Sequence, residues 1–450
     1  MASPSSQPPK VIIVGAGIAG PILAVFLKLN GYSPVIYERQ SQSAPGGICL
    51  TCVQHAFLST VDLHVSHHTF LQPNGLRVLE MIPGLLPKIS GAIVDSLQFY
   101  SVEPSDPGLL AHSQIIADLV KEGQLRYPWT TVNRGQFHDL ILAEATEVYG
   151  VPIFYDHSVV DVVENEEEGS VSVRFADGRS DSAAFVVGCD GLHSNTRVAL
   201  FGREKADFTG MTQMGGMSPF PVDETLRRGM TNLYGDGLHF LSYPTSDETI
   251  CWIITQHENE AKETWKPMDD AGQEEVRQGP YSQLPYGAGE LVRTCKQIVK
   301  YGLYDRPELK SWYRGRVVLL GDAAHPTSPH LGQGANQSFE DVYHLVRLLN
   351  KHNGGTSTNF MQQDVAKAVY PPHLRMRMGR MRTSHSWTCQ TTSDGAVYMR
   401  AALVGTRSCF ICLIGRICYL IHSWHFKLTC GVMNHFILRS SALQFRTTRG

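Results

Sequence analysis

The chain has 450 residues, of which 42% are hydrophobic and 18% are charged, a composition that excludes a disordered or fibrous protein. At roughly 150 residues per domain, this length favours two or three domains with a large buried core. Lysine and arginine number 39 against 42 acidic residues, a formal net charge of -3 with no long basic stripe, so we expect no nucleic-acid partner.

The ten cysteines are few and irregularly spaced, unlike the disulfide framework of a secreted domain. We therefore expect a reducing, cytoplasmic location. Two Cys-x-x-Cys spacings, Cys49/Cys52 and Cys409/Cys412, lie far apart without the histidine spacing typical of zinc sites, and we expect no metal site. The apolar run after Lys10 is broken by glycines and a proline, which argues against a signal peptide.

The first structural motif is a strand followed by a glycine-rich turn. Val11–Val14 is a β-branched run typical of a buried parallel strand, and Gly15, Gly17 and Gly20 follow it with GxGxxG spacing. Such glycines allow a tight turn, close approach to a pyrophosphate and close helix–strand packing. A second predicted strand ends at Glu38, 18 residues beyond the last glycine, which suits a carboxylate that accepts ribose hydroxyls. The pattern predicts a dinucleotide such as FAD or NAD.

A second glycine-rich region lies late in the chain. Val317–Leu320 predicts another buried strand, and it is followed by the turn sequence GDAAHP and by the loop Gly332–Asn336. We expect a helix from Ala335, whose N-terminal dipole would face whatever binds on that loop. The apolar residues at helical spacing are Phe339, Val342, Leu345, Val346 and Leu349.

These motifs resemble a known family. The segment GDAAHPTSPHLGQGANQSFED is similar to the flavin-binding motif of the single-component FAD-dependent monooxygenases, the p-hydroxybenzoate hydroxylase class. A third segment, residues 186–197 with Asp190 followed by Gly191, is similar to that family's DG motif, which is implicated in FAD and NAD(P)H contact. The resemblance implies an α/β fold: a Rossmann-like FAD-binding domain with an interleaved β-sheet substrate domain and a C-terminal helical region.

The resemblance also assigns cofactor-binding residues. Glu38 would hold the adenosine ribose, the three glycines the pyrophosphate, and Asp322 the ribityl or pyrophosphate region. The loop that contains Gly334 would lie along the isoalloxazine, with Ala335 donating its backbone N–H. The full set assigned to FAD is Gly15, Gly17, Gly20, Glu38, Gly47, Arg134, Asp190, Asp322, Gly334 and Ala335.

Structural roles are the alternative for some residues of these motifs. Arg134 matches a family arginine that reaches FAD, but it also opens a predicted helix capped by Asn133, where exposed arginines are common. Asp190 and Arg197 have the alternative of a capping acid and a salt-bridged loop base. For His325 we favour a backbone-bonded residue that shapes the loop over a catalytic one. No catalytic residue is assigned.

The strand-rich middle of the chain predicts the domain division. We expect the first part of the FAD-binding domain at 10–200, a β-rich substrate domain at 201–300, the second part of the FAD-binding domain at 301–375, and an atypical tail at 376–450. Alternation along the strands does not say which face is exposed to solvent, so for each candidate pocket residue we favour a core position over a ligand contact. They are Tyr234, His239, Tyr243 and Trp252.

Two stretches depart from the family pattern. The His-rich stretch Cys52–Phe70 separates segments that are nearly contiguous in relatives, and we hypothesise that it is an insertion or translated intron. In the tail, Ala401–Ile421 is apolar enough to suggest a membrane anchor, but Arg407 and Arg416 within it would be costly in hydrocarbon. A buried or interfacial helix, or an aberrant tail, is the favoured interpretation.

The resemblance implies an enzyme in which NAD(P)H reduces FAD, O2 reacts, and one oxygen atom reaches an apolar small molecule. That substrate is an aromatic ring to be hydroxylated or an isoprenoid alkene to be epoxidised. The likeness is strongest to fungal natural-product enzymes, which favours secondary-metabolite biosynthesis. The alternatives are an FAD-binding reductase or dehydrogenase that inserts no oxygen, and an inactive relic of the flavin fold.

Overall fold

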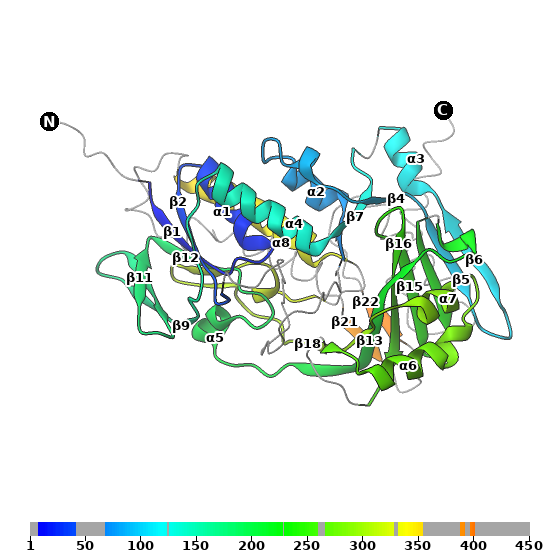
Figure 1. The fold of residues 1–450 in the computed structure, drawn as a ribbon. Helices are drawn as coiled ribbons and strands as arrows, with labels where there is room; N and C mark the ends of the chain where they lie inside the picture. The colour runs from blue at the N-terminus through cyan, green and yellow to red at the C-terminus, as the bar shows by residue number, and fades with distance from the viewer. Residues whose placement is uncertain are drawn as a thin grey trace, which may run out of the picture.

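The computed structural model describes residues 8–41, 68–123, 126–227, 229–259, 266–327, 332–353, 388–391 and 397–400. These residues build two large sheets, which lie at the left and the right of Figure 1. The combination of a parallel sheet covered by helices with a second, largely antiparallel sheet confirms the expected α/β fold.

The first sheet is parallel except for one edge strand. Ile12 and Ile13 point to its opposite faces and both are fully buried, as a continuous β-branched run predicts for a sheet covered on both sides. In spatial order its strands are β19 (Tyr313–Arg314), β20 (Val317–Leu319), β12 (Phe185–Gly188), β1 (Lys10–Val14), β2 (Ser33–Tyr37) and β8 (Ile153–Phe154).

Helices cover one face of this sheet and a small antiparallel sheet covers the other. The helices are α1 (Ala19–Leu29), α2 (Pro73–Leu79), α4 (Arg134–Ala143) and α8 (Gly334–Asn353), and α1 packs against α8 and α4 (Figure 1). The small sheet consists of β9 (Val159–Asn165), β10 (Ser170–Phe175) and β11 (Ser180–Ala183), and α5 (Asn195–Phe201) packs on β9.

The second sheet has eight strands. One of its faces packs against α6 (Asp270–Gln278) and α7 (Ala288–Thr294), where Phe240, Trp252 and Ile254 are fully buried. In spatial order its strands are β17 (Lys266–Pro267), β18 (Val299–Asp305), β13 (Asp207–Pro219), β16 (Thr249–His257), β15 (Leu238–Pro244), β14 (Met230–Gly235), β5 (Leu97–Ser101) and β6 (Gly108–Ser113).

A third, three-stranded sheet connects the two large ones. It consists of β3 (His68–Leu71), β7 (Trp129–Asn133) and β4 (Ala92–Val94). The Phe70 ring lies 4.6 Å from the Tyr243 ring of the second sheet, and Thr131 Oγ1 donates to the Pro244 carbonyl at 2.7 Å. The last three residues of the expected insertion, His68–Phe70, belong to a strand paired with β7, and the insertion stays a prediction.

The remaining elements are short. They are α3 (Ile115–Lys121), a π-helix (Glu144–Val148), 3-10 turns at Leu86–Lys88, Glu224–Arg227, Pro280–Gln283 and Gly321–Ala323, and the hairpin of β21 (Thr388–Thr391) and β22 (Val397–Arg400). Across the parts of the chain that the structure describes, no helix is long and apolar enough to cross a membrane.

The expected domain boundaries stay predictions. The second sheet draws β5 and β6 from the first 200 residues, and its strand β18 runs from Val299 to Asp305. Several sequence features lie outside the described residues: Gly47, both Cys-x-x-Cys pairs, most of Cys52–Phe70, the expected C-terminal helical region and Ala401–Ile421.

Candidate flavin site

The turn between β1 and α1 uses its three glycines differently. Gly15 has φ +102°, and a Cβ there would lie 2.7 Å from the Cys189 carbonyl oxygen. A Cβ at Gly20 would lie 2.1 Å from the Gly15 carbonyl oxygen. A Cβ at Gly17 would meet no atom within 4 Å. Packing therefore requires glycine at positions 15 and 20, whereas Gly17 leaves an open surface at the start of the helix.

Glu38 is fixed against this turn. Its Oε2 accepts a hydrogen bond from the Ala16 N–H at 2.7 Å, and its Oε1 accepts one from the Gln40 N–H at 2.9 Å. On the other side, Nε2 of His138 lies 2.6 Å from the Ala16 carbonyl oxygen. Because a carboxylate has about four acceptor positions, Glu38 retains capacity for a ligand's hydroxyl groups. The contact from His138 was not anticipated from the sequence.

The backbone of the segment after β12 packs against the glycine turn, whereas the side chain of Asp190 forms hydrogen bonds within its own segment. Asp190 Oδ1 accepts from Ser194 Oγ at 2.5 Å, and Oδ2 accepts from the N–H and Oγ1 of Thr196 at 3.0 and 3.1 Å. Burial raises the pKa of Asp190, while these hydrogen bonds act to lower it. Arg197 is buried and pairs with Glu204 at 2.5 Å. These are the contacts of a capping acid and a salt-bridged base, the structural alternative for both residues.

The turn after β20 is held by a carboxylate of α8. Asp341 Oδ2 accepts from the Gly321 N–H at 2.9 Å and lies 2.6 Å from Nε2 of His325. The His325 ring also lies 4.7 Å from the Trp312 ring. Although burial acts to lower it, the neighbouring Asp341 carboxylate raises the pKa of His325 above its usual value. His325 thus contacts a carboxylate of α8, and its backbone N–H donates to the Gly321 carbonyl at 2.9 Å.

Asp322 projects from the same turn toward the start of α8. A Cβ at Gly334 would lie 3.8 Å from Asp322 Oδ1 and 3.7 Å from Thr327 Oγ1. Burial raises the pKa of Asp322, and the positive charges of His325 and Arg134 act against that rise. The structure thus places Asp322 beside Gly334, and Arg134, which comes 188 residues earlier, is near enough for its charge to act on Asp322.

Asn336 fixes the loop at the start of α8. Its Nδ2 donates to the carbonyl oxygens of Phe70 at 2.8 Å and Gly332 at 2.9 Å, and its Oδ1 accepts from the Gln72 N–H at 2.9 Å. Gln333 adds a hydrogen bond from its Nε2 to Gln72 Oε1 at 2.5 Å. The motif contained Asn336, but nothing in the sequence indicated that two of its partners are Phe70 of β3 and Gln72 just after that strand.

Comparison with known proteins identifies the family of this site. A model of the FAD binding domain matches residues 9–361 of the chain. The chain belongs to the FAD binding domain family. It is an FAD-dependent monooxygenase, as the resemblance implied.

Two relatives of this monooxygenase are themselves monooxygenases named for aromatic compounds. It is 28% identical over 407 residues to 6-hydroxynicotinate 3-monooxygenase of Pseudomonas fluorescens, covering 86% of this chain and 94% of the relative. It is 28% identical over 357 residues to 3-amino-4-hydroxybenzoate 2-monooxygenase PtmB3 of Streptomyces platensis, covering 77% and 80%. Its fold matches Klebsiella pneumoniae HpxO, solved with FAD and uric acid, with a TM-score of 0.63 at 21% identity over 83% of this chain and 85% of that one.

The residues of this monooxygenase fit FAD. The surface left open at Gly17 is the place where a pyrophosphate approaches a helix N-terminus. Glu38 stands at the end of β2 with acceptor capacity, and Asp322 faces the backbone of Gly334. When bound, FAD supplies the redox and oxygen chemistry that no side chain can supply. The roles of the individual residues remain predictions.

The candidate pocket residues of the second sheet divide between its two faces. Trp252 is fully buried on the face covered by α6 and α7, where its Nε1 donates to Ser218 Oγ at 3.1 Å, so it occupies the core position that we favoured over a place in the pocket. Tyr243 lies on the opposite face against Phe70. Strand register places Tyr234 and His239 on that same face.

Proposed function

We propose that this monooxygenase uses NADH or NADPH and O2 to hydroxylate an apolar aromatic small molecule. In the balanced reaction, a C–H bond of the substrate becomes C–OH, the second oxygen atom leaves as water, and NAD(P)H is oxidised to NAD(P)+. The observation that carries the proposal is that the loop at Gly332 and a partly exposed face of the second sheet contact the same residue, Phe70. The names of these two relatives support an aromatic substrate, and an isoprenoid alkene stays the second candidate because two other relatives are named zeaxanthin epoxidase.

We assign the residues of this chain the following tasks. Glu38 accepts hydrogen bonds from the adenosine ribose, and the open backbone at Gly17 admits the pyrophosphate. Asp322 binds the ribityl or pyrophosphate region, and the Ala335 N–H donates toward the isoalloxazine. The protein must exclude water from this site, because oxygen transfer to the substrate competes with unproductive release of hydrogen peroxide.

The biological setting is a further part of the proposal. The likeness to fungal natural-product enzymes supports secondary-metabolite biosynthesis, and the sparse, irregular cysteines support a cytoplasmic location. We retain the division into a FAD-binding domain in two parts and an interleaved substrate domain.

Isotopic labelling tests the reaction. The purified chain, reconstituted with FAD, is supplied with 18O2, NADH or NADPH, and a panel of phenols. We expect product that carries one labelled oxygen. NAD(P)H consumption with unlabelled product identifies a reductase or dehydrogenase instead. A protein that binds no FAD when the cofactor is added identifies a relic of the fold.

A further inference from the structure

The two faces of the second sheet differ in what covers them. On the face toward α6 and α7, Phe240 and Trp252 are fully buried. On the opposite face, Leu241 and Ile253 lie at the centre of the sheet and remain partly exposed. Because apolar side chains at the centre of a sheet are normally covered, this exposure is typical of the floor of a binding site.

Strand register aligns polar side chains across this second face. Tyr301 of β18 lies opposite Gln213 of β13, which lies opposite Thr255 of β16. Thr255 lies opposite His239 of β15, and His239 lies opposite Tyr234 of β14. We call these five residues the polar row.

Contacts between neighbours join the polar row in two groups, one of three residues and one of two. The Tyr301 hydroxyl donates to Gln213 Oε1, and Gln213 Nε2 donates to Thr255 Oγ1 at 3.0 Å. The His239 and Tyr234 rings are stacked with centroids 4.9 Å apart and planes at 10°. Gln213, Thr255 and Tyr301 are buried, so a hydrogen bond to a ligand there would form away from bulk water, where it is strong.

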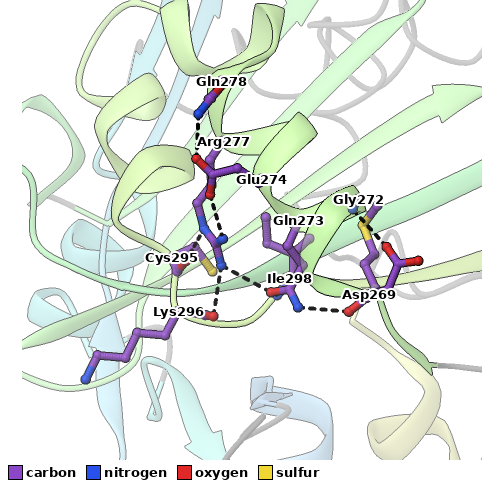
Figure 2. A network of polar contacts seen from close by, with 10 residues as sticks. Asp269, Gly272, Gln273, Glu274, Arg277, Gln278, Cys295, Lys296 and Ile298 are labelled. Atoms are coloured by element: carbon purple, nitrogen blue, oxygen red, sulfur yellow. Dashed lines mark hydrogen bonds and ion pairs between the residues drawn. The ribbon is translucent and has the colours of Figure 1, made fainter.

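The position of Tyr301 in the row is fixed from outside the sheet. Figure 2 shows Arg277 and Gln273 of α6 holding the segment that enters β18. Arg277 donates from Nε to the Cys295 carbonyl at 2.9 Å, and Gln273 Oε1 accepts from the Ile298 N–H at 2.9 Å. These contacts fix the register of β18 and therefore keep Tyr301 opposite Gln213.

The rows beside the polar row are mainly apolar. The next row contains Gly215, Ile253, Leu241 and the buried Asn232, whose Oδ1 lies 3.0 Å from His239 Nε2, and the one after it contains Met217, Cys251 and Tyr243. Tyr243 contacts Phe70, and Phe70 in turn lies 3.0 Å from the position of a Cβ at Gly332. The face thus changes from polar to apolar toward the loop that holds Gly332.

No permanent charge stands in these three rows. Every residue named in them is uncharged at neutral pH except that His239 can be protonated. Burial raises the pKa of Cys251 to about 12, so its thiol stays neutral as well. A carboxylate placed on this floor would have neither an arginine nor a lysine of the three rows beside it, and burying an unpaired carboxylate is costly.

We propose that the polar row is a specificity device for a neutral substrate. The row hydrogen-bonds an uncharged polar group, such as a hydroxyl or carbonyl, while the apolar body lies over Leu241, Ile253 and Cys251 toward the loop at Gly332. Carboxylate substrates are disfavoured, unlike the nicotinate and benzoate in the names of the two relatives. This inference rests on the proposed function.

Matched ligand pairs test the inference on the FAD-loaded full chain. Each pair is a phenol ester and its free acid, beginning with methyl 4-hydroxybenzoate and 4-hydroxybenzoate. Binding is followed by the change in the visible spectrum of the bound FAD. We expect the ester to bind at least about tenfold more tightly than the acid, since an unpaired buried charge costs at least that factor. Equal binding, tighter binding of the acids, or no binding of any neutral phenol overturns the inference.

Substitutions in the polar row test whether its residues cause the preference for esters over acids. Tyr301→Phe and Thr255→Val each remove one hydroxyl, and we expect each to weaken binding of the esters about five- to tenfold while acid binding changes less. The matched control is Thr212→Val, which removes a buried hydroxyl from β13 on the opposite face. If one of these two variants does not fold and bind FAD, the ester and acid affinities of the other variant test the inference. A row variant that behaves like the control overturns the inference.

The labelling experiment separates the two proposals. Labelled product from free acids, with no preference for esters, would overturn the neutral-substrate inference and leave monooxygenation standing. Preferential binding of esters with no label in any product would overturn the proposed reaction and leave the binding preference standing.

Discussion

The open surface at Gly17 gives the sharpest test of the flavin site. A Gly17→Ala side chain meets no atom within 4 Å, so the FAD-free protein should keep its fold. Alanine also restricts the unfolded chain, which would add about 0.4–1 kcal/mol of stability. The same methyl group occupies the approach of the pyrophosphate, and losing one charge-assisted hydrogen bond of about 1.5–3 kcal/mol weakens FAD binding roughly 10- to 100-fold.

The assay pairs an FAD titration with thermal unfolding of the FAD-free protein. Gly20→Ala is the matched control, because its Cβ would lie 2.1 Å from the Gly15 carbonyl oxygen and must displace the backbone. We expect Gly20→Ala to lower the melting temperature and Gly17→Ala to leave it unchanged or slightly raised. Wild-type FAD affinity in Gly17→Ala, or a melting temperature as low as that of Gly20→Ala, would refute the assignment.

Three further substitutions address the site and the core. Glu38→Gln keeps the side-chain shape but removes one of two acceptor oxygens, and we expect FAD titration to show about tenfold weaker binding; unchanged affinity would argue against a ribose contact. Trp252→Phe should lower stability in urea by about 1 kcal/mol and leave the ester preference intact; an altered preference would place Trp252 in the pocket. Burial raises the pKa of Glu340 from 4.5 to about 7. The free energy of unfolding of the wild-type protein therefore falls as the pH rises from 4.5 to about 7. The free energy of unfolding of Glu340→Gln, relative to that of the wild type, should therefore rise between pH 5 and pH 8 by up to about 3 kcal/mol, at 1.36 kcal/mol per pKa unit. The same difference between the two proteins at both pH values would contradict a buried Glu340 carboxyl.

The part of the fold around the first sheet is predictable because its signals are local. Val11–Val14, the glycines after it and the acid at the end of the next strand all lie within 30 residues of one another. Each feature reflects a local structural requirement. The apolar run suits a strand buried on both faces, the glycine suits the positive φ at Gly15, and the acid suits a carboxylate that contacts the turn. Their spacing therefore predicts the structure without knowledge of distant contacts.

The faces of the second sheet are not predictable in this way. Alternation along β16 places Trp252 and Ile253 on opposite faces but does not say which face α6 and α7 will cover. The polar row depends on the register of five strands, and β18 joins β13 from more than 80 residues away. Asp190 shows a related limit, since the motif gives its identity, whereas its hydrogen bonds to Ser194 and Thr196 appear only in the folded turn.

Phe70 and Asn336 join the flavin loop to the second sheet. The Asn336 side chain reaches β3 through Phe70 and Gln72, which precede it by 266 and 264 residues. The Phe70 ring lies against Tyr243 of the second sheet, while its Cβ faces Gly332 of the loop. Because packed side chains move together, a ligand that displaces Tyr243 must also press on Phe70 and hence on the loop at Gly332. The apolar end of the floor is thereby linked to the segment assigned to the isoalloxazine, whereas the polar row lies four residues further along β15 and β16.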